Sequence, residues 1–122
     1  MRPESAARVW DASEAATAIC DFVADKTETE FLAELLLRSA VERQLEILGE
    51  ALNHLRKKDL ETAARVPDLD RIVGMRNVIA HEYGDVDYEI VWAAVTKRIP
   101  ELLAVLDALL QEAGPAPKAP ES

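Results

Sequence analysis

The chain has 122 residues, 49% of them hydrophobic and only 5% aromatic, with a formal net charge of −9. This length corresponds to one domain that can bury a substantial core. The acidic balance argues against nucleic-acid binding, which requires Lys and Arg to neutralise phosphates, unless basic residues gather locally. The single cysteine, Cys20, excludes an internal disulfide. No apolar run is long enough to cross a bilayer and no signal-peptide core is present, so we expect a cytoplasmic protein without membrane contact.

The first predicted element is a helix over residues 5 to 25. Its apolar positions recur near helical spacing, at Val9, Ala12, Ala16, Ile19 and Val23. Cys20 lies on the stripe formed by Ala16 and Val23, so we interpret it as buried core filler and not as a nucleophile. Thr27 or Thr29 is the predicted N-cap of the next helix, because each places a hydroxyl ahead of acidic first-turn residues.

The second helix is predicted to run from about Glu30 to about Lys57, and it carries two adjacent apolar stripes. The first consists of Val41, Leu45, Leu48, Leu52 and Leu55, and the second of Leu37, Ala40, Gln44, Ile47 and Ala51. Two stripes are more than one partner helix requires. Either the second stripe contacts another subunit, or this helix is central and contacted on two sides within one bundle. The pattern alone does not distinguish these alternatives.

The remaining elements follow from capping and breaking residues. Residues 59 to 65 predict a short helix ended by Val66-Pro67, and Asp68 or Asp70 is expected to cap a third helix that runs to about Tyr83. Gly84 is placed to end that helix. The last helix is predicted to begin near Asp87, and Pro100 should bend it by removing one backbone hydrogen bond.

The predicted fold class is therefore all-α. We expect an up-down antiparallel bundle of four main helices plus a short connecting helix. The bundle domain is predicted over residues 1–113, and residues 114–122 form a Pro-rich tail that we expect to be disordered.

The segment RNVIAHEY, residues 76 to 83, contains the residues with the most suggestive chemistry. On a helix, Asn77 and His81 share a face because they are four residues apart, whereas Arg76 and His81 point about 140° apart. Ile72, Met75 and Ile79 are expected to face the core, which directs the polar residues toward an edge or a groove.

These residue types suit RNA cleavage by the ribose 2′-hydroxyl, a reaction that needs no metal. An imidazole such as that of His81 exchanges protons near neutral pH. Arg76 can stabilise charge developing on a phosphate, and Asn77 can orient either group. The reaction requires both an acid and a base, and a two-fold dimer would supply a second histidine. No cluster of His, Asp and Glu has the spacing of metal ligands, so we expect no metal site.

A purely structural interpretation of the same segment is favoured by spacing alone. A histidine in the last turn of a helix is often just a favourable C-terminal charge, and Arg76 can pair with Glu82 or with an acid on another helix. The basic run HLRKK has two interpretations as well. Its Arg56, Lys57 and Lys58 could line an RNA track, or they could be cations at the C-terminus of the long helix. His54 belongs to the second interpretation, as an exposed helix-end residue and not a second catalyst.

Two longer segments favour the catalytic interpretation over the structural one. They are VERQLEILGEAL at 41 to 52 and IVGMRNVIAHEYGDVD at 72 to 87, followed by Trp92 near the start of the last helix. Together they closely resemble the HepT-like branch of the HEPN superfamily, over a range from about Arg8 to about Glu112. The resemblance implies a dimeric helical bundle, without cofactor, that acts as a metal-independent ribonuclease toxin of a two-gene toxin–antitoxin module of type II or type VII character. Its composite active site would lie at the dimer interface.

The resemblance also implies roles for individual residues. The R-x4-H-x-Y motif of that family falls on Arg76, His81 and Tyr83, and the polar residue after the arginine falls on Asn77. Arg76, Asn77 and His81 would then be catalytic. The partner implied is a minimal nucleotidyltransferase antitoxin that transfers AMP to Tyr83, where the added negative charge would block RNA.

Two functions therefore remain as hypotheses. The first is an endoribonuclease toxin that cleaves mRNA or tRNA. The alternative is a catalytically inert dimeric scaffold, or a nucleotide-binding partner subunit of a nucleotidyltransferase, which the acidic composition and the single histidine per motif would suit.

Overall fold

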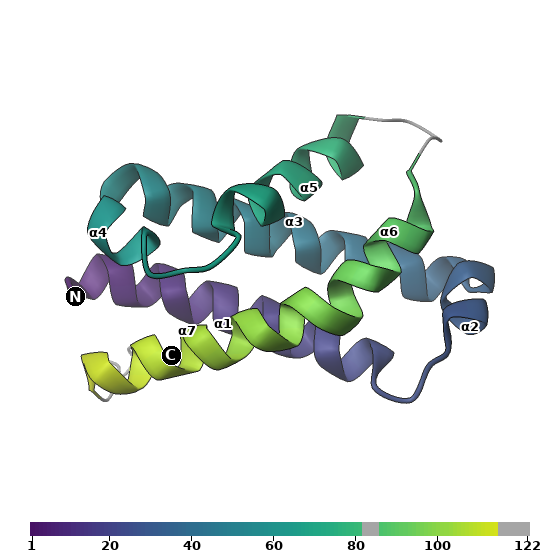
Figure 1. The fold of residues 1–122 in the computed structure, drawn as a ribbon, viewed down its shortest axis with the longest axis horizontal. Coiled ribbons are helices and arrows are strands. Elements are labelled where there is room, and N and C mark those ends of the chain that lie inside the picture. The colour runs from purple at the N-terminus through teal and green to yellow at the C-terminus, as the bar shows by residue number, and fades with distance from the viewer. Residues whose placement is uncertain (82–85, 115–122) are drawn as a thin grey trace, which may run out of the picture.

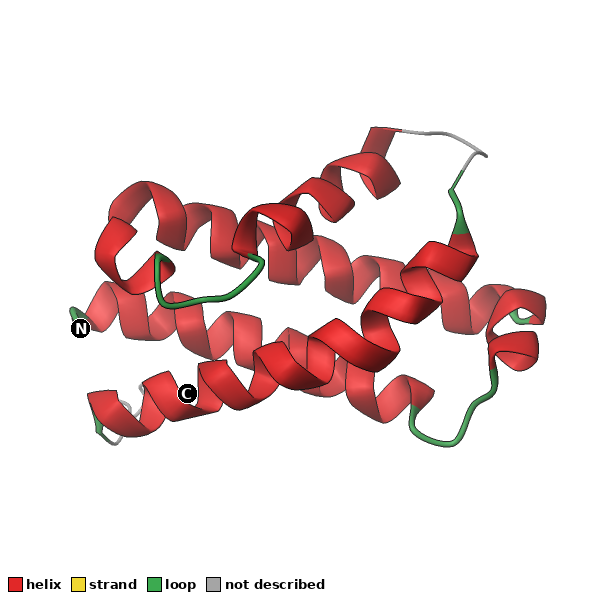
Figure 2. Cartoon of the chain, viewed as in Figure 1, coloured by secondary structure: helices red, strands yellow, loops and turns green. Residues whose placement is uncertain are grey.

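The computed structural model describes the backbone of residues 1–81 and 86–114, and the side chains of residues 1–75 and 86–114. Over these ranges every regular element is a helix (Figure 2). The elements are α1 (Pro3–Val23), α2 (Glu28–Ala33), α3 (Leu35–Lys58), α4 (Leu60–Ala63), α5 (Leu69–His81), α6 (Tyr88–Ala93), the π-helical turn η1 (Ala94–Arg98) and α7 (Ile99–Ala113). The predicted all-α class is confirmed. The tail from 115 to 122 lies outside the described residues.

The long helices run up and down along one axis of the molecule (Figure 1). Helix α1 packs against both α3 and α7, and α5 returns along α3 on the way to α6. One hydrophobic core joins these helices, and its largest fully buried side chains are Phe31, Ile19, Leu45, Leu48, Leu52, Leu55, Ile99, Leu102, Leu106, Leu109, Val9 and Val41. None of the helices in the described part of the chain combines the length and hydropathy needed to cross a bilayer.

Helix α1 follows the predicted pattern, since all five apolar positions of its stripe are buried. Two hydroxyls fix its register. Ser13 Oγ donates a hydrogen bond of 2.7 Å to Asp107 Oδ1 on α7, and Ser5 Oγ donates one of 2.6 Å to Asp59 Oδ2. Cys20 is partly buried and packs against the core, so it lies at the margin of the stripe. Burial, and then the nearby charge of Asp21, raises the pKa of its thiol, which agrees with a packing role.

Asp59 organises the corner between α3 and α4. Its Oδ1 accepts a hydrogen bond of 3.0 Å from the backbone N–H of Thr62, so it is the N-cap of α4. Its Oδ2 accepts bonds from the hydroxyls of Ser5 and Thr62, at 2.6 and 2.7 Å. These donors, with Ser5 first, lower the pKa of Asp59 to about 2. The short helix predicted over residues 59 to 65 is thus confirmed, in a shorter form.

The predicted continuous second helix is wrong in its first turns. Thr27 is indeed an N-cap, because Thr27 Oγ1 accepts from the Glu30 backbone N–H at 3.1 Å and Glu30 Oε1 accepts from the Thr27 N–H at 2.9 Å. The helix that follows, α2, ends at Ala33, and Glu34 is extended with φ −100° and ψ 103°. The break lets α2 bury Phe31, whose ring centroid lies 5.2 Å from that of Trp92 on α6.

The two stripes of α3 differ in their burial. All five residues of the first stripe are buried in the core. In the second, Leu37 and Ala51 are buried, while Ala40, Gln44 and Ile47 are partly exposed. Helix α1 packs along α3 and shares a surface groove with Gln44, Ile47 and Ala51. The second stripe therefore has a partner within the protomer, as expected for a central helix contacted on two sides.

The last helix begins where predicted and is irregular before Pro100. Asp87 Oδ1 accepts from the backbone N–H groups of Glu89 and Ile90, at 3.0 and 3.3 Å, and caps α6. The π turn η1 then separates α6 from α7, in which Pro100 occupies the first turn. A proline lacks the N–H that would continue a regular ladder, so the winding widens in the turn that precedes it.

Candidate functional site

The residues of the R-x4-H motif lie in the C-terminal half of α5. Arg76, Asn77 and His81 are all part of this helix, and His81 is its last residue. At helical spacing, position 76 continues the line of Leu69 and Val73, while positions 77 and 81 share a neighbouring face. Their side chains, and Tyr83 altogether, lie outside the described residues. The structure thus confirms the predicted helix, and the roles of the four residues stay predictions.

The first half of α5 is fixed to the bundle by apolar contacts. Leu69, Ile72 and Val73 are buried, and Met75 is partly buried against the core. The predicted core-facing role is therefore confirmed for Ile72 and holds in part for Met75, while Ile79 lies among the side chains that are not described. Because the buried face continues from the start of the helix, it sets the rotation of α5 about its axis.

Two ion pairs hold the N-terminus of α5. Arg56 Nη1 of α3 donates to Asp70 Oδ1 at 2.6 Å, and Arg98 Nη1 of η1 donates to Asp68 Oδ2 at 2.8 Å. The Asp68 carbonyl accepts from the Ile72 N–H at 3.0 Å, and Asp68 has a positive φ of 57°. Asp68 thus precedes the first turn as predicted, but its carboxylate binds an arginine and not the helix N–H groups. Both pairs are partly exposed, so each contributes orientation more than stability.

The start of α6 is anchored to α3 on the other side of the motif. Tyr88 Oη donates a hydrogen bond of 2.8 Å to Glu42 Oε1, and the Arg38 guanidinium lies 4.9 Å from the centre of the Tyr88 ring. Phe31 of α2 meets the same ring edge-on, with centroids 6.3 Å apart. Burial, followed by the hydrogen bond to Glu42, raises the pKa of Tyr88. These contacts anchor the start of α6, which follows the motif in the chain, to α2 and α3.

A groove of about 790 Å³ separates α5 from the α6–η1 segment. Its lining is mainly apolar and includes Met75, Val86, Ile90, Val91, Ala93 and Ala94, with Arg71, Asp87, Lys97, Arg98 and Glu101 also contributing. Arg71 and Lys97 are exposed, and neither makes an ion pair with any acid among the described side chains. The sequence shows both cations, but it gives no sign that residues 26 positions apart line the same groove.

The basic run at the end of α3 lies beside the beginning of α5. Arg56 is engaged with Asp70 and also donates to Asn53 Oδ1 at 2.5 Å, whereas Lys57 and Lys58 are exposed. His81 lies eleven positions after Asp70 along α5, a rise of roughly 16 Å. The run and the motif histidine are thus at opposite ends of α5 (Figure 1). RNA binding by Arg56, Lys57 and Lys58 stays a prediction.

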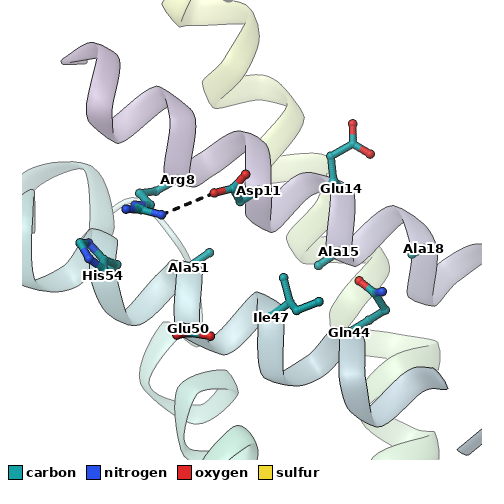
Figure 3. A pocket seen from close by; sticks show the side chains of 10 residues that line it. All are labelled: Arg8, Asp11, Glu14, Ala15, Ala18, Gln44, Ile47, Glu50, Ala51 and His54. Carbon is teal, nitrogen blue, oxygen red and sulfur yellow. Dashed lines mark ion pairs between the residues drawn. The ribbon is translucent and has the colours of Figure 1, made fainter. Parts of the chain in front are cut away.

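A second groove, of about 670 Å³, lies between α1 and α3 (Figure 3). The Arg8–Asp11 ion pair of 3.6 Å lies on its α1 side, and Gln44, Ile47 and His54 come from α3. These α3 positions are on the face opposite the one that carries Glu42 and Arg56, which bind the α6 and α5 partners. His54 is exposed, as predicted, and lies on the side of α3 away from α5.

This arrangement bears on the predicted dimer. A second subunit seated on the Gln44–Ile47 face alone would leave the two copies of α5 on the outer sides of the assembly. A composite site would instead need contact on the side that carries α5.

Within residues 1–75 and 86–114, no group of three or more His, Cys, Asp or Glu could hold a metal ion.

Fold and motif together define a class of protein: a small all-α bundle domain in which an arginine–histidine motif ends a helix packed on the central one. A family model described as Ribonuclease HepT-like matches residues 12–109. The chain belongs to this HepT-like ribonuclease family, as its resemblance to HepT-like sequences predicted.

Individual relatives agree with the family. The chain is 36% identical to "Putative RNase TTE0752" of Caldanaerobacter subterraneus subsp. tengcongensis, over 76% of this chain and 86% of the relative. It is 33% identical to "Putative RNase MJ1380" of Methanocaldococcus jannaschii, over 77% and 85%. Identity to "Probable ribonuclease HepT" of Thermococcus cleftensis is 29%, over 81% and 89%. No solved structure matches the chain.

Proposed function

We propose that this protein is an endoribonuclease that cleaves RNA without a metal, and that it is the toxin of a toxin–antitoxin module. The observation that carries the proposal is the position of Arg76, Asn77 and His81 at the end of one bundle helix in a chain of the HepT-like family. Relatives named as ribonucleases cover most of the chain, including this helix.

The reaction we propose is internal transesterification. The ribose 2′-oxygen attacks the adjacent phosphorus and the bond to the 5′-oxygen breaks, which leaves a 2′,3′-cyclic phosphate and a 5′-hydroxyl. One proton leaves the 2′-hydroxyl and one reaches the departing oxygen, and His81 would serve as base or acid for these transfers. Arg76 would stabilise the pentacovalent phosphate, and Asn77 would orient it. His81 from a second copy would supply the complementary acid or base in a homodimer.

The test is cleavage of mRNA and tRNA by purified protein in the presence of a chelator. We expect the wild type to release 5′-hydroxyl products, and His81→Ala and Arg76→Ala to lose this activity. His54→Ala is the matched control, because His54 is the other histidine of the chain and lies on the opposite side of α3. Equal cleavage by wild type and His81→Ala would reject the assignment.

The proposed partner is a nucleotidyltransferase antitoxin that modifies Tyr83. In this step the Tyr83 oxygen attacks the α-phosphorus of ATP, pyrophosphate leaves, and the phenolic proton passes to solvent. Where the reading frame beside this gene encodes a nucleotidyltransferase, incubation with that enzyme and ATP should add one AMP group, detected by mass spectrometry. Tyr83→Phe should abolish the addition. Tyr88→Phe should retain it, because the Tyr88 hydroxyl is engaged by Glu42.

The alternative is an inert dimeric scaffold for such a partner, and the net charge of −9 is the observation that favours it. Expression in the absence of the partner separates the two functions. Growth arrest that requires His81 supports the toxin, whereas a stable complex without growth arrest or cleavage supports the scaffold.

A further inference from the structure

The unpaired cations of the surface lie in two places, and one of these is the groove beside α5. The described part of the chain contains six ion pairs, which engage Arg8, Lys26, Arg43, Arg56, Arg65 and Arg98. Among the exposed cations whose side chains are described, Arg2, Lys57, Lys58, Arg71 and Lys97 have no such partner there. Arg2, Lys57 and Lys58 lie at the end of α3, where Arg2 donates to the Lys58 carbonyl, and the other two, Arg71 and Lys97, line the groove between α5 and the α6–η1 segment.

Paired and unpaired cations differ in what they offer an anionic polymer. A cation that already faces a carboxylate adds little net positive potential, whereas an uncompensated one attracts phosphate. In a chain with a net charge of −9, RNA can approach only where such cations gather. Two acids, Glu101 and Asp87, also line the groove and oppose these cations, and the Asp87 carboxylate accepts hydrogen bonds from the N-terminal N–H groups of α6.

The apolar lining favours single strands over duplexes. Met75, Val91 and the protruding Ile90, which is 62% exposed, offer aliphatic contacts to the faces of bases. Only unstacked bases present those faces, because in a duplex they are stacked on one another. The volume of about 790 Å³ lies within the range of roughly 300 to 1,000 Å³ that holds ligands of small-molecule size. The groove therefore has room for a short stretch of nucleotides.

We propose that this groove binds the single-stranded RNA on its way to the cleavage motif. Arg71 and Lys97 contact phosphates from opposite walls, and Met75, Ile90 and Val91 contact the bases between them. The groove shares α5 with Arg76 and His81, so a strand lying in it runs along the helix that carries the motif. This inference rests on the proposed ribonuclease function.

The experiment measures binding of a fluorescein-labelled, unstructured RNA oligomer to the full-length His81→Ala protein by anisotropy, at several salt concentrations. In this background we compare Arg71→Gln/Lys97→Gln with Lys26→Gln/Arg43→Gln, which removes two surface cations that are already paired with acids. Each phosphate contact to a single strand contributes about 0.7 to the slope of log K against log salt. We expect the groove variant to lower this slope by about 1.4 and to weaken binding about tenfold or more, and the control to change neither.

A third variant in the same binding experiment distinguishes apolar contacts to the bases from electrostatic contacts to the phosphates. Ile90→Ala should weaken binding without changing the salt slope, because it removes base contact and no charge. Circular dichroism confirms that each variant is folded. The proposal is overturned if the groove variant binds like the wild type, or if only Lys57→Gln/Lys58→Gln weakens binding, since the basic run would then be the track.

Oligomeric state and wild-type activity distinguish the remaining outcomes. If Arg71→Gln/Lys97→Gln or Ile90→Ala dissociates an oligomer in analytical ultracentrifugation, a second copy occupies the groove and the proposal is wrong. If the wild-type protein cleaves RNA and the groove variant cleaves it with unchanged KM, only the inference fails. If the wild type neither binds nor cleaves RNA, the proposed function fails together with the inference.

Discussion

Phe31 is the side chain on which the position of α2 depends, and its removal makes a quantitative prediction. It is fully buried and is the only buried residue of this six-residue helix, which is too short to be stable by itself. Its ring contacts Trp92 and Tyr88 on α6, with centroid separations of 5.2 and 6.3 Å. Phe31→Ala should therefore release α2 and uncover the start of α6.

The expected cost follows from the burial. Truncating a buried phenylalanine to alanine typically costs about 3–5 kcal/mol, which combines lost transfer free energy with the cavity left behind. Domains of this size are stabilised by about 5–15 kcal/mol, so Phe31→Ala should remove a large fraction of the free energy of unfolding. Phe31→Leu keeps most of the apolar volume and should cost less than about 1.5 kcal/mol.

Urea denaturation followed by circular dichroism measures both costs. In a Trp10→Phe background, tryptophan fluorescence reports on Trp92 alone, and Phe31→Ala should shift its emission to the red. Hydrogen exchange should show residues 28–33 losing protection before α1 and α3. A cost below about 1 kcal/mol, with unchanged Trp92 emission, would refute the view that Phe31 docks α2 on α6.

Two further predictions concern Asp59 and Tyr88. The folded-state pKa of Asp59 is about 2, below its ordinary value of 3.8, so its carboxylate stabilises the fold above about pH 4 and this contribution is lost as the pH falls toward 2. Asp59→Asn should therefore lower the melting temperature at pH 7, with the difference from wild type vanishing near pH 2; an equal difference at both pH values would contradict this. Tyr88→Phe leaves Glu42 without its donor and should cost about 1–3 kcal/mol in urea denaturation. In Tyr83→Phe protein, absorbance titration should show the Tyr88 phenol ionising above its ordinary pKa of 10, and ionisation at or below that value would count against burial.

Local signals in the sequence were sufficient for most elements. Thr27 and Asp87 cap the helices that they were predicted to begin, because a cap uses only contacts within four residues of chain. The stripe from Val41 to Leu55 is buried because helical periodicity requires an apolar face to be covered by some neighbour. The predicted family followed from two motif segments, and a match over residues 12–109 confirms it.

Features that depend on distant partners were not predictable in this way. The break at Glu34 lies within a run of good helix formers with no Gly or Pro, and it exists because burying Phe31 against α6 outweighs continued helix. Asp68 and Asp70 bind Arg98 and Arg56 instead of capping α5 with their carboxylates, since those arginines arrive from other elements.

The candidate site shows the same division. The sequence by itself determined that Arg76, Asn77 and His81 share one helix, because their spacing and the helix periodicity are local properties. Only the tertiary structure decided that Arg71 and Lys97 line one groove beside that helix, while Lys57 and Lys58 lie at its far end. The physical reason is that helix packing is set by the fit of whole apolar faces. This packing brings together charged residues that are far apart in the chain, and their sequence separation does not predict the contact.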